Sequence, residues 1–384
     1  MLVVAAGLAG CKPDDRRGLA PPGPTTPVPT PSRSLSPVPV DRADWSINLE
    51  GDSVEIAPVF AGGDVFVVTH HGKLAALDAR SGAARWRHDL RDLSSALAVA
   101  DARLYVLSKA ANAPECQLRT FDTANGASLW SWSSARCPAV RGTMADGAVY
   151  LTVDGVDDGT GDTRDQDPSR IVALDARTGR PRWSHRFDTA AQLLEPVVED
   201  RTVFVSTSRA ELVALNTASG KVRWQVNLEG GNLSGPVAAN GLVHVTRTRG
   251  YGESAVHSFD GQTGRRRWLY PARDLISTVP VVAAKTIVIV RRDGRVHGLN
   301  DQTGRVRWTR DLRDTDPANP GDLFPVSDGA TVYVRRGSAL HALDADTGRT
   351  RWSDPSPPPG TPLAAHNGVV YLSASDGTFS AANG

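Results

Sequence analysis

The chain has 384 residues, 40% of them hydrophobic and 22% charged, so it is long enough to bury a sizeable core. Its 43 Lys and Arg residues balance 42 Asp and Glu residues, which argues against a nucleic-acid-binding protein. The 36 Gly and 26 Pro residues favour many short strands and tight turns over long helices. No run of 18 apolar residues occurs, so the sequence predicts no membrane-spanning helix.

Residues 1–11 have the features of a lipoprotein signal peptide. The ten apolar residues before Cys11 suit the apolar region of a secretory signal and are too few to cross a bilayer. Residues 8–11 read Leu-Ala-Gly-Cys, which resembles the bacterial lipobox, where the Cys thiol carries lipid and becomes the mature N-terminus. We therefore expect Cys11 to be lipidated; the alternative is a frayed N-terminus with a chance cysteine.

A Pro-, Thr- and Ser-rich segment follows at 12–43. It holds nine prolines, and such chains are extended and bury little, so we expect a disordered stalk. Anchor and stalk together predict an extracytoplasmic protein tethered to a bacterial membrane. Lys12 follows the cysteine, so the acidic signal for inner-membrane retention is absent. The Arg- and Ala-rich composition resembles that of a high-GC bacterium with a single membrane, where the tether would reach the cell membrane.

From residue 44 to residue 384 one motif recurs. A typical copy reads Ala-Leu-Asp-x-x-Thr-Gly-x-x-Arg-Trp, and successive glycines lie 44, 53, 41, 44, 40 and 44 residues apart. A period near 44 is typical of a repeat that supplies four short strands. The glycines are Gly82, Gly126, Gly179, Gly220, Gly264, Gly304 and Gly348. The tryptophans are Trp45, Trp86, Trp130, Trp183, Trp224, Trp268, Trp308 and Trp352.

Each motif position has a physical reason. Asp or Asn can accept hydrogen bonds from backbone N–H groups in a turn, and Gly supplies the positive φ of a short hairpin loop. The Trp lies on the fourth strand, where it can pack between neighbouring sheets. An Arg precedes the Trp in six of seven copies. We interpret this Arg as part of the scaffold, paired with acidic residues at the rim.

The repeat resembles the pyrroloquinoline-quinone (PQQ)-type β-propeller repeat over roughly residues 44–384. The resemblance implies an all-β fold, an eight-bladed β-propeller of four-stranded antiparallel blades. The last repeat ends before its Trp strand, whereas residues 44–49 supply one, with Trp45 lying 41 residues before Trp86. We therefore expect the N-terminal strand to complete the C-terminal blade, which closes the ring and removes open sheet edges.

This family includes quinoprotein dehydrogenases, and the resemblance implies calcium, a catalytic Asp and often an adjacent-cysteine disulfide in those enzymes. The chain has no adjacent Cys pair and no Gly-x-Ser-x-Gly, His-Glu-x-x-His or Gly-x-x-x-x-Gly-Lys-Ser/Thr motif. We expect no catalytic residues, no cofactor and no enzymatic activity. A PQQ-dependent dehydrogenase, or a sensor of a small ligand in the central channel, is an alternative.

An acidic insert at 154–167 is a candidate calcium site, because carboxylates with glycine suit that ion. Its spacing does not match the Asp-x-Asp-x-Asp-Gly pattern, so a solvated loop is the alternative. Adjacent His70 and His71 are interpreted as a hairpin tip. The calcium candidates are Asp154, Asp157, Asp158 and Asp162.

Cys116 and Cys137 form an even pair once Cys11 carries lipid, and an extracytoplasmic compartment is oxidising. Cys116 opens the third strand of the second repeat, and Cys137 lies just past its fourth strand. The hairpin around 123–126 places Cys116 opposite about residue 133, or nearer to Cys137 if a bulge shifts the register. We expect a Cys116–Cys137 disulfide; the alternative is two free thiols.

Connections between second and third strands vary in length, being long at 108–115, in the acidic insert and at 249–254, as is the linker 313–322. In a four-stranded blade these connections share one face, and variable loops on a rigid scaffold usually carry binding. We expect a monomeric scaffold that binds a protein or peptide there. The layout is similar to that of lipoproteins of the outer-membrane β-barrel assembly machine, so an assembly role is an alternative where an outer membrane exists.

Overall fold

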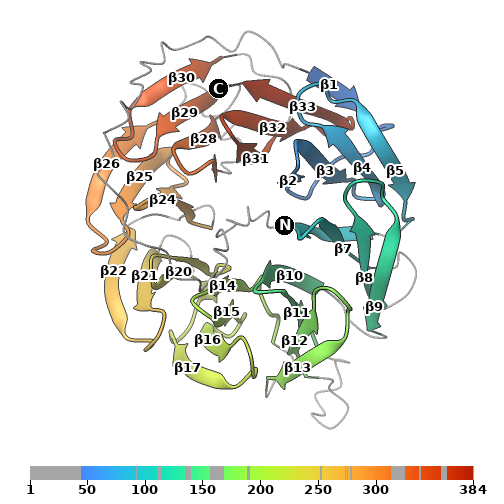
Figure 1. Ribbon diagram of the computed structural model, residues 1–384. Coiled ribbons are helices and arrows are strands. Elements are labelled where there is room, and N and C mark those ends of the chain that lie inside the picture. The colour runs from blue at the N-terminus through green and yellow to red at the C-terminus, as the bar shows by residue number, and fades with distance from the viewer. Residues whose placement is uncertain are drawn as a thin grey trace, which may run out of the picture.

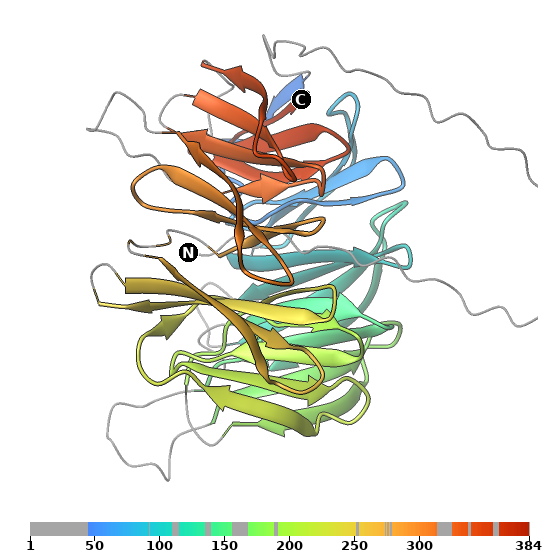
Figure 2. The same ribbon diagram turned by 90° about the vertical axis from the view of Figure 1, so that its left-hand side faces the viewer.

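The computed structural model describes residues 45–91, 93–109, 115–134, 140–155, 168–187, 191–250, 253–272, 274, 276, 279–312, 325–336, 339–355 and 361–383. Within these ranges the regular secondary structure consists of β-strands alone, and the strands form eight separate sheets. Figure 1 shows the sheets arranged in a ring around a central axis, and Figure 2 shows the resulting disc edge-on. The expected eight-bladed β-propeller is confirmed. No helix that could cross a membrane occurs among the described residues.

Blades 1 to 4 each run from the centre of the ring to its rim in chain order. Blade 1 contains β2 (Val59–Ala61), β3 (Asp64–Val68), β4 (Lys73–Asp78) and β5 (Ala84–Asp89). Blade 2 contains β6 (Leu93–Ala100), β7 (Arg103–Lys109), β8 (Cys116–Asp122) and β9 (Ser128–Ser134). Blade 3 contains β10 (Val140–Ala145), β11 (Ala148–Val153), β12 (Arg170–Asp175) and β13 (Pro181–Arg186). Blade 4 contains β14 (Val197–Glu199), β15 (Thr202–Ser206), β16 (Glu211–Asn216) and β17 (Val222–Asn227).

Blades 5 to 7 repeat this order. Blade 5 contains β18 (Asn232–Leu233), β19 (Val237–Ala239), β20 (Leu242–Arg249), β21 (Glu253–Asp260) and β22 (Arg266–Ala272). Blade 6 contains β23 (Val281–Ala283), β24 (Thr286–Val290), β25 (Arg295–Asn300) and β26 (Val306–Asp311). Blade 7 contains β27 (Val326–Ser327), β28 (Thr331–Arg336), β29 (Ala339–Asp344) and β30 (Thr350–Asp354).

Blade 5 differs from the others because its innermost strand is split into β18 and β19, both of which pair with β20. The break falls at Gly235 and Pro236, and proline has no backbone N–H to donate to a ladder. In addition, β20 and β21 are eight residues long, so this hairpin extends further than the five- and six-residue strands of blade 4.

Blade 8 joins the two ends of the described chain. It contains β31 (Thr361–His366), β32 (Val369–Ser373) and β33 (Thr378–Asn383), with β1 (Trp45–Asn48) as its outermost strand. Trp45 pairs with Ala381, and the ladder runs antiparallel to the pair of Asn48 with Thr378. The blue β1 lies beside the red β33 in Figure 1. The predicted closure of the ring by the N-terminal strand is therefore confirmed.

The core lies between the blades. The second strands β3, β15 and β24 are buried along their whole length, whereas the fourth strand β5 is almost entirely exposed. A typical interblade cluster joins Phe66 and Leu74 of blade 1 to Val106 and Phe121 of blade 2. Each sheet thus buries both faces against its neighbours, so no single blade has a core of its own.

Candidate functional site

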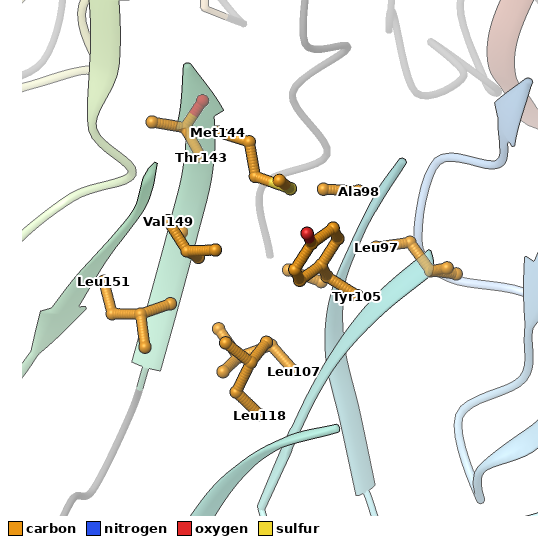
Figure 3. Close-up of a pocket in the computed structure, with 11 residues that line it drawn as sticks. Leu97, Ala98, Tyr105, Leu107, Leu118, Thr143, Met144, Val149 and Leu151 are labelled. Atoms are coloured by element: carbon orange, nitrogen blue, oxygen red, sulfur yellow. The ribbon is translucent and has the colours of Figure 1, made fainter. Parts of the chain in front are cut away.

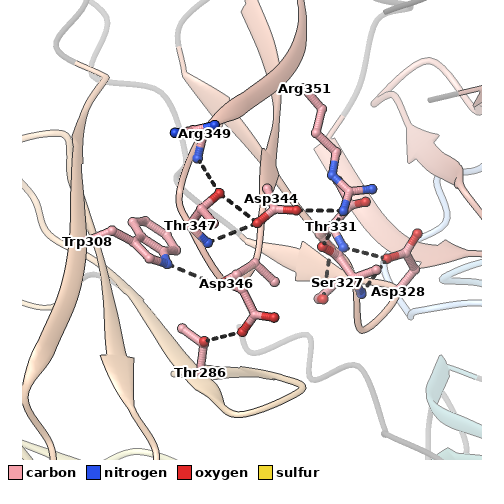
Figure 4. Close-up of polar contacts among 12 residues, drawn as sticks. Thr286, Trp308, Ser327, Asp328, Thr331, Asp344, Asp346, Thr347, Arg349 and Arg351 are labelled. Atoms are coloured by element: carbon pink, nitrogen blue, oxygen red, sulfur yellow. Dashed lines mark hydrogen bonds and ion pairs between the residues drawn. The ribbon is translucent and has the colours of Figure 1, made fainter. Parts of the chain in front are cut away.

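The repeated aspartate organises the turn between the third and fourth strands. In blade 7, Oδ1 of Asp344 accepts hydrogen bonds from the backbone N of Thr347 at 2.9 Å and from its hydroxyl at 2.7 Å (Figure 4). Oδ2 of the same carboxylate accepts from Nη2 of Arg351 at 2.8 Å. In blade 3 the equivalent hydrogen bond from Arg182 holds the pKa of Asp175 far below its usual range. These polar residues therefore stabilise the turns of the propeller itself.

The repeated tryptophan connects each blade to the next. Nε1 of Trp308 donates to the backbone oxygen of Ala345 at 3.0 Å, and a Cβ added at Gly348 would lie 2.4 Å from the indole. Between blades 2 and 3 the corresponding oxygen, that of Ala176 in blade 3, accepts instead from the hydroxyl of Tyr105 in blade 2 at 2.8 Å. Trp352 is buried among residues of blades 7 and 8. The tryptophans that donate to the next blade as Trp308 does are Trp45, Trp86, Trp183, Trp224 and Trp268.

The tryptophan also explains the glycine. At each motif glycine φ is positive, between 65° and 72°, and an added Cβ would lie within 3 Å of an indole of the preceding blade. Glycine is therefore required twice, for its backbone conformation and for the space the indole occupies. The positions are Gly82, Gly126, Gly179, Gly220, Gly264, Gly304 and Gly348.

The arginine before the tryptophan has two arrangements. In blades 1, 3 and 7 the first motif position is Asp, and the arginine pairs with it within the same blade. Where that position is Asn, the arginine reaches the next blade: Nη1 of Arg223 donates to Oε1 of Gln262 at 2.9 Å, and Nη1 of Arg307 lies 2.9 Å from Oδ1 of Asp346. An amide carries no charge, so the guanidinium finds its partner across the blade boundary.

Of the calcium candidates, only Asp154 lies among the described residues. Its side chain is buried, its Oδ1 accepts from the backbone N of Leu193 at 2.7 Å, and its Oδ2 lies 3.4 Å from Nη1 of Arg141. Burial raises the pKa of this carboxyl above its usual value. Asp154 thus connects blade 3 to the start of blade 4. The remaining candidates, Asp157, Asp158 and Asp162, lie outside the described residues.

His70 and His71 sit at the tip of the β3–β4 hairpin, as expected. Nδ1 of His71 lies 2.8 Å from Oδ1 of Asp52, and Nδ1 of His70 lies 3.1 Å from Oε2 of Glu55. These contacts tie the hairpin tip to the segment that follows the closing strand. Within the described ranges, no three His, Cys, Asp or Glu side chains are grouped closely enough to hold a metal ion.

Cys116 opens β8 and is fully buried. A bulge between Thr120 and Phe121 shifts the register so that Cys116 pairs with Ser134, one residue nearer to Cys137 than a regular hairpin would place it. Cys137 and Cys11 both lie outside the described residues, as does the whole of 1–44. The disulfide, the lipid anchor, the signal peptide and the stalk therefore stay predictions.

The second-to-third-strand connections share one face of the disc, which we call the variable-loop face. Much of the long connections, at 110–114, 156–167, 251–252 and 313–324, lies outside the described residues. The described part of this face includes His71 in blade 1, Arg209 in blade 4 and Glu253 in blade 5, all exposed. The opposite face carries the uniform motif turns, such as that of Ala124 and Asn125.

A small apolar cavity lies between blades 2 and 3. Tyr105, Leu107 and Leu118 of blade 2 face Met144 and other residues of blade 3 around about 20 Å³ of space (Figure 3). This volume holds a single water molecule, and the lining offers it few polar partners. The cavity is therefore no ligand site.

A larger hollow of about 580 Å³, which we call the interblade groove, lies between blades 4 and 5. Its apolar lining comprises Val226, Leu228 and Phe259, and its cationic lining comprises Arg247, Arg249 and Arg266. The buried His257 also lines it, and its ring nitrogens have no hydrogen-bond partner among the described residues. These residues were not predicted from the sequence. The available signal was Val226, a small side chain at the position where blades 1, 2, 3, 5 and 6 have His, Trp, His, Tyr and Arg.

The repeat region matches the family model described as outer membrane protein assembly factor BamB, over residues 39–169, 167–324 and 313–384. The chain belongs to the BamB family. It is 35% identical over 124 residues to BamB of Nitrosomonas eutropha, covering 32% of this chain and 28% of that protein. The crystal structure of BamB from Moraxella catarrhalis superposes with a TM-score of 0.64 at 17% identity, covering 88% of this chain and 98% of that one. At this identity the superposition shows the shared fold.

Proteins with other names also match. Serine/threonine-protein kinase AfsK of Streptomyces griseus is 30% identical over 180 residues, covering 43% of this chain and 20% of that protein. Polyvinylalcohol dehydrogenase of a Pseudomonas species is 24% identical over 290 residues, covering 63% of this chain and 38% of that protein. The chain thus spans between a fifth and two fifths of the length of these curated relatives.

Proposed function

We propose that this BamB-family chain is a membrane-tethered, extracytoplasmic scaffold that binds a protein or peptide and catalyses no reaction. The observation that carries the proposal is that recurring motif positions and variable loops lie in different parts of each blade. The repeated polar residues are used in turns and blade contacts, whereas length variation is confined to the variable-loop face. Membership of the BamB family supports protein partners.

Photo-crosslinking tests the binding face. A photoreactive residue placed at His71, Arg209 or Glu253 should crosslink to a distinct protein in native membranes, identified by mass spectrometry. Matched controls at Ala124 and Ala218, exposed in the motif turns of the opposite face, should not. Crosslinks from the control positions alone, or equally from both faces, contradict the proposed binding face.

The tether is tested separately. Two acyl chains suffice for stable anchoring where one does not. A palmitate analogue should label the protein, and Cys11→Ala should abolish the label and release the propeller from the membrane fraction. Equal labelling of the variant contradicts the anchor.

A role in outer-membrane protein assembly is the second candidate, favoured by the match of the BamB model along the whole propeller. It applies if the source has an outer membrane. Deletion of the gene should then lower the amount of folded β-barrel proteins in that membrane. Unchanged levels in such a bacterium contradict it.

The absence of quinone chemistry is also a proposal, because a dehydrogenase is among the relatives. Purified protein should bind no PQQ and oxidise no alcohol or sugar when calcium is supplied. A ligand at 100 times its dissociation constant stabilises by about 2.7 kcal/mol, so binding would raise the unfolding temperature. Saturable PQQ binding with reduction of a redox dye contradicts the proposal.

A further inference from the structure

The interblade groove lies where a fourth strand carries a small side chain, Val226. Two residues after the repeat tryptophan, the fourth strand usually sends a large side chain towards the next blade. Nε2 of His88 lies 2.7 Å from a backbone oxygen of blade 2, the ring of Tyr270 lies 6.2 Å from a ring of blade 6, and Nε of Arg310 donates to a backbone oxygen of blade 7. In blade 4 this position is Val226, and the space of about 580 Å³ opens there.

Three guanidinium groups surround this space. Nη1 of Arg247 donates to the backbone oxygen of Leu228 at 2.8 Å, and Nη2 of Arg249 donates to that of Glu229. These contacts hold two of the groups against the end of blade 4, and Arg266 contributes the third from β22. A guanidinium carries five N–H donors, more than these contacts use, in a planar fork that matches a carboxylate.

The cationic lining is not neutralised by an equal number of acids, since Glu229 is the one acidic residue among the described residues that line the groove. Burial and the charge of Arg249 lower the pKa of Arg247, an effect that Glu253 partly offsets. Burial, together with the charges of Arg247 and Arg266, lowers the pKa of His257 to about 4. An anion in the groove would relieve this mutual repulsion.

The groove also offers more than charge. Its volume is several times that of one carboxylate group, and its lining includes the apolar side chains of Val226, Leu228 and Phe259. Arg249 ends β20 on the variable-loop face, whereas Gly264 and Arg266 lie at the motif turn of the opposite face. The groove therefore runs along the rim between the two faces, and its Arg249 end adjoins the face of the proposed binding function. A lining of both cationic and apolar side chains suits a chain segment with both acidic and apolar side chains.

We propose that the interblade groove binds an acidic peptide segment of a partner protein, whose carboxylates meet the three arginines. This inference rests on the proposed function, because it names the chemistry of the partner. The groove is a lateral site between two blades, separate from the central channel.

The test uses the full chain and a fluorescent hexaglutamate peptide, with hexaglutamine as the neutral control. Hexaglutamate should bind at low salt, weaken as salt is added, and exceed hexaglutamine in affinity. Val226→Trp keeps every charge and fills the space with a side chain that blade 2 tolerates at the same position, Trp132. It should lower the affinity at least tenfold, as should Arg266→Gln. Arg267→Gln, the adjacent exposed arginine outside the groove, should leave the affinity within twofold.

A second measurement keeps the result independent of folding defects. The unfolding temperature of Val226→Trp should match that of the native chain, and hexaglutamate should raise the pKa of His257, followed by NMR, in the native chain alone. Equal peptide binding by native chain and Val226→Trp overturns the inference. So does inorganic phosphate that binds as tightly as the peptide, because it would indicate a small-ion site. If hexaglutamate fails while His71 and Glu253 still crosslink to a protein, the groove inference fails and the proposed function stands.

Discussion

At the residue scale, the motif glycine is constrained both by its positive φ and by the indole that lies against it. Gly220 has a φ of 67°, and a Cβ there would lie 2.5 Å from Cε3 of Trp183. Gly241 has a φ of 79° with nothing within 4 Å of an added Cβ. The pair therefore separates the cost of backbone conformation from the cost of displacing an indole.

We expect Gly241→Ala to lower the free energy of unfolding by about 1 kcal/mol, because alanine is strained at positive φ. Gly220→Ala should lower it by about 3 kcal/mol or more, because the Trp183 indole must also move. Urea denaturation of both variants measures the difference. Equal losses would show that the indole is not held against this glycine.

The Cys116–Cys137 disulfide also belongs to this scale. The observed register brings Cys116 opposite Ser134, three residues before Cys137. A bond closing this loop is worth up to about 3 kcal/mol in the chain-entropy model. Non-reducing peptide mapping of protein from its native compartment should recover the linked pair. Two separately alkylated cysteines would contradict it.

At the element scale, β20 carries a buried histidine that makes the free energy of unfolding depend on pH. His244 is fully buried with its ring 5.3 Å from that of Trp268, and burial lowers its pKa to about 3. In the unfolded chain the His244 imidazole is protonated below about pH 6.5, whereas in the folded chain it stays neutral until the pH approaches 3. Neutral His244 therefore costs the folded state nothing above pH 6.5, and the free energy of unfolding decreases as the pH falls from 6.5 towards 3.

We expect the native chain to lose about 2 kcal/mol of stability through His244 between pH 7 and pH 5. His244→Phe should remove this part of the loss, so its free energy of unfolding changes less over the same range. His366→Asn, at an exposed histidine, is the control and should keep the native pH dependence. An unchanged pH dependence in His244→Phe would mean that His244 is protonated in the folded state.

At the scale of the whole molecule, one strand decides whether the ring is closed. Ser46 of β1 pairs with Ser380 of β33, and their hydroxyl oxygens lie 3.3 Å apart. Replacing both with cysteine would link residues that are 334 positions apart in the chain. Loop-closure entropy then stabilises the ring by up to about 5 kcal/mol.

The Ser46→Cys, Ser380→Cys double variant should therefore melt at a higher temperature under oxidising than under reducing conditions. The native chain treated in the same way is the control, because it carries its own predicted disulfide. A variant that forms the bond and melts no higher would mean that the closing strand does not limit unfolding.

Much of the fold could be predicted because the repeat is written into the sequence. Spacing indicated repeats of four short strands, and the resemblance to the PQQ-type repeat implied eight blades. The missing Trp strand of the last repeat indicated closure by residues near Trp45. Blade 5 could not be predicted in the same detail, because the split of its inner strand at Pro236 and the extension of β20 and β21 leave the repeat spacing almost unchanged.

The sequence by itself determined the local pattern: the turn at each Asp or Asn, the positive φ of each glycine and the strand that bears each tryptophan. These follow from residue type and short-range spacing. The tertiary structure alone decided what lies between blades. The interblade groove depends on Val226 of one blade and on Arg247, Arg249 and Arg266 of the next, and only ring packing brings those side chains together. Contacts between sheets depend on how side chains from two blades fill the same space, and the periodicity of the sequence contains no information about that packing.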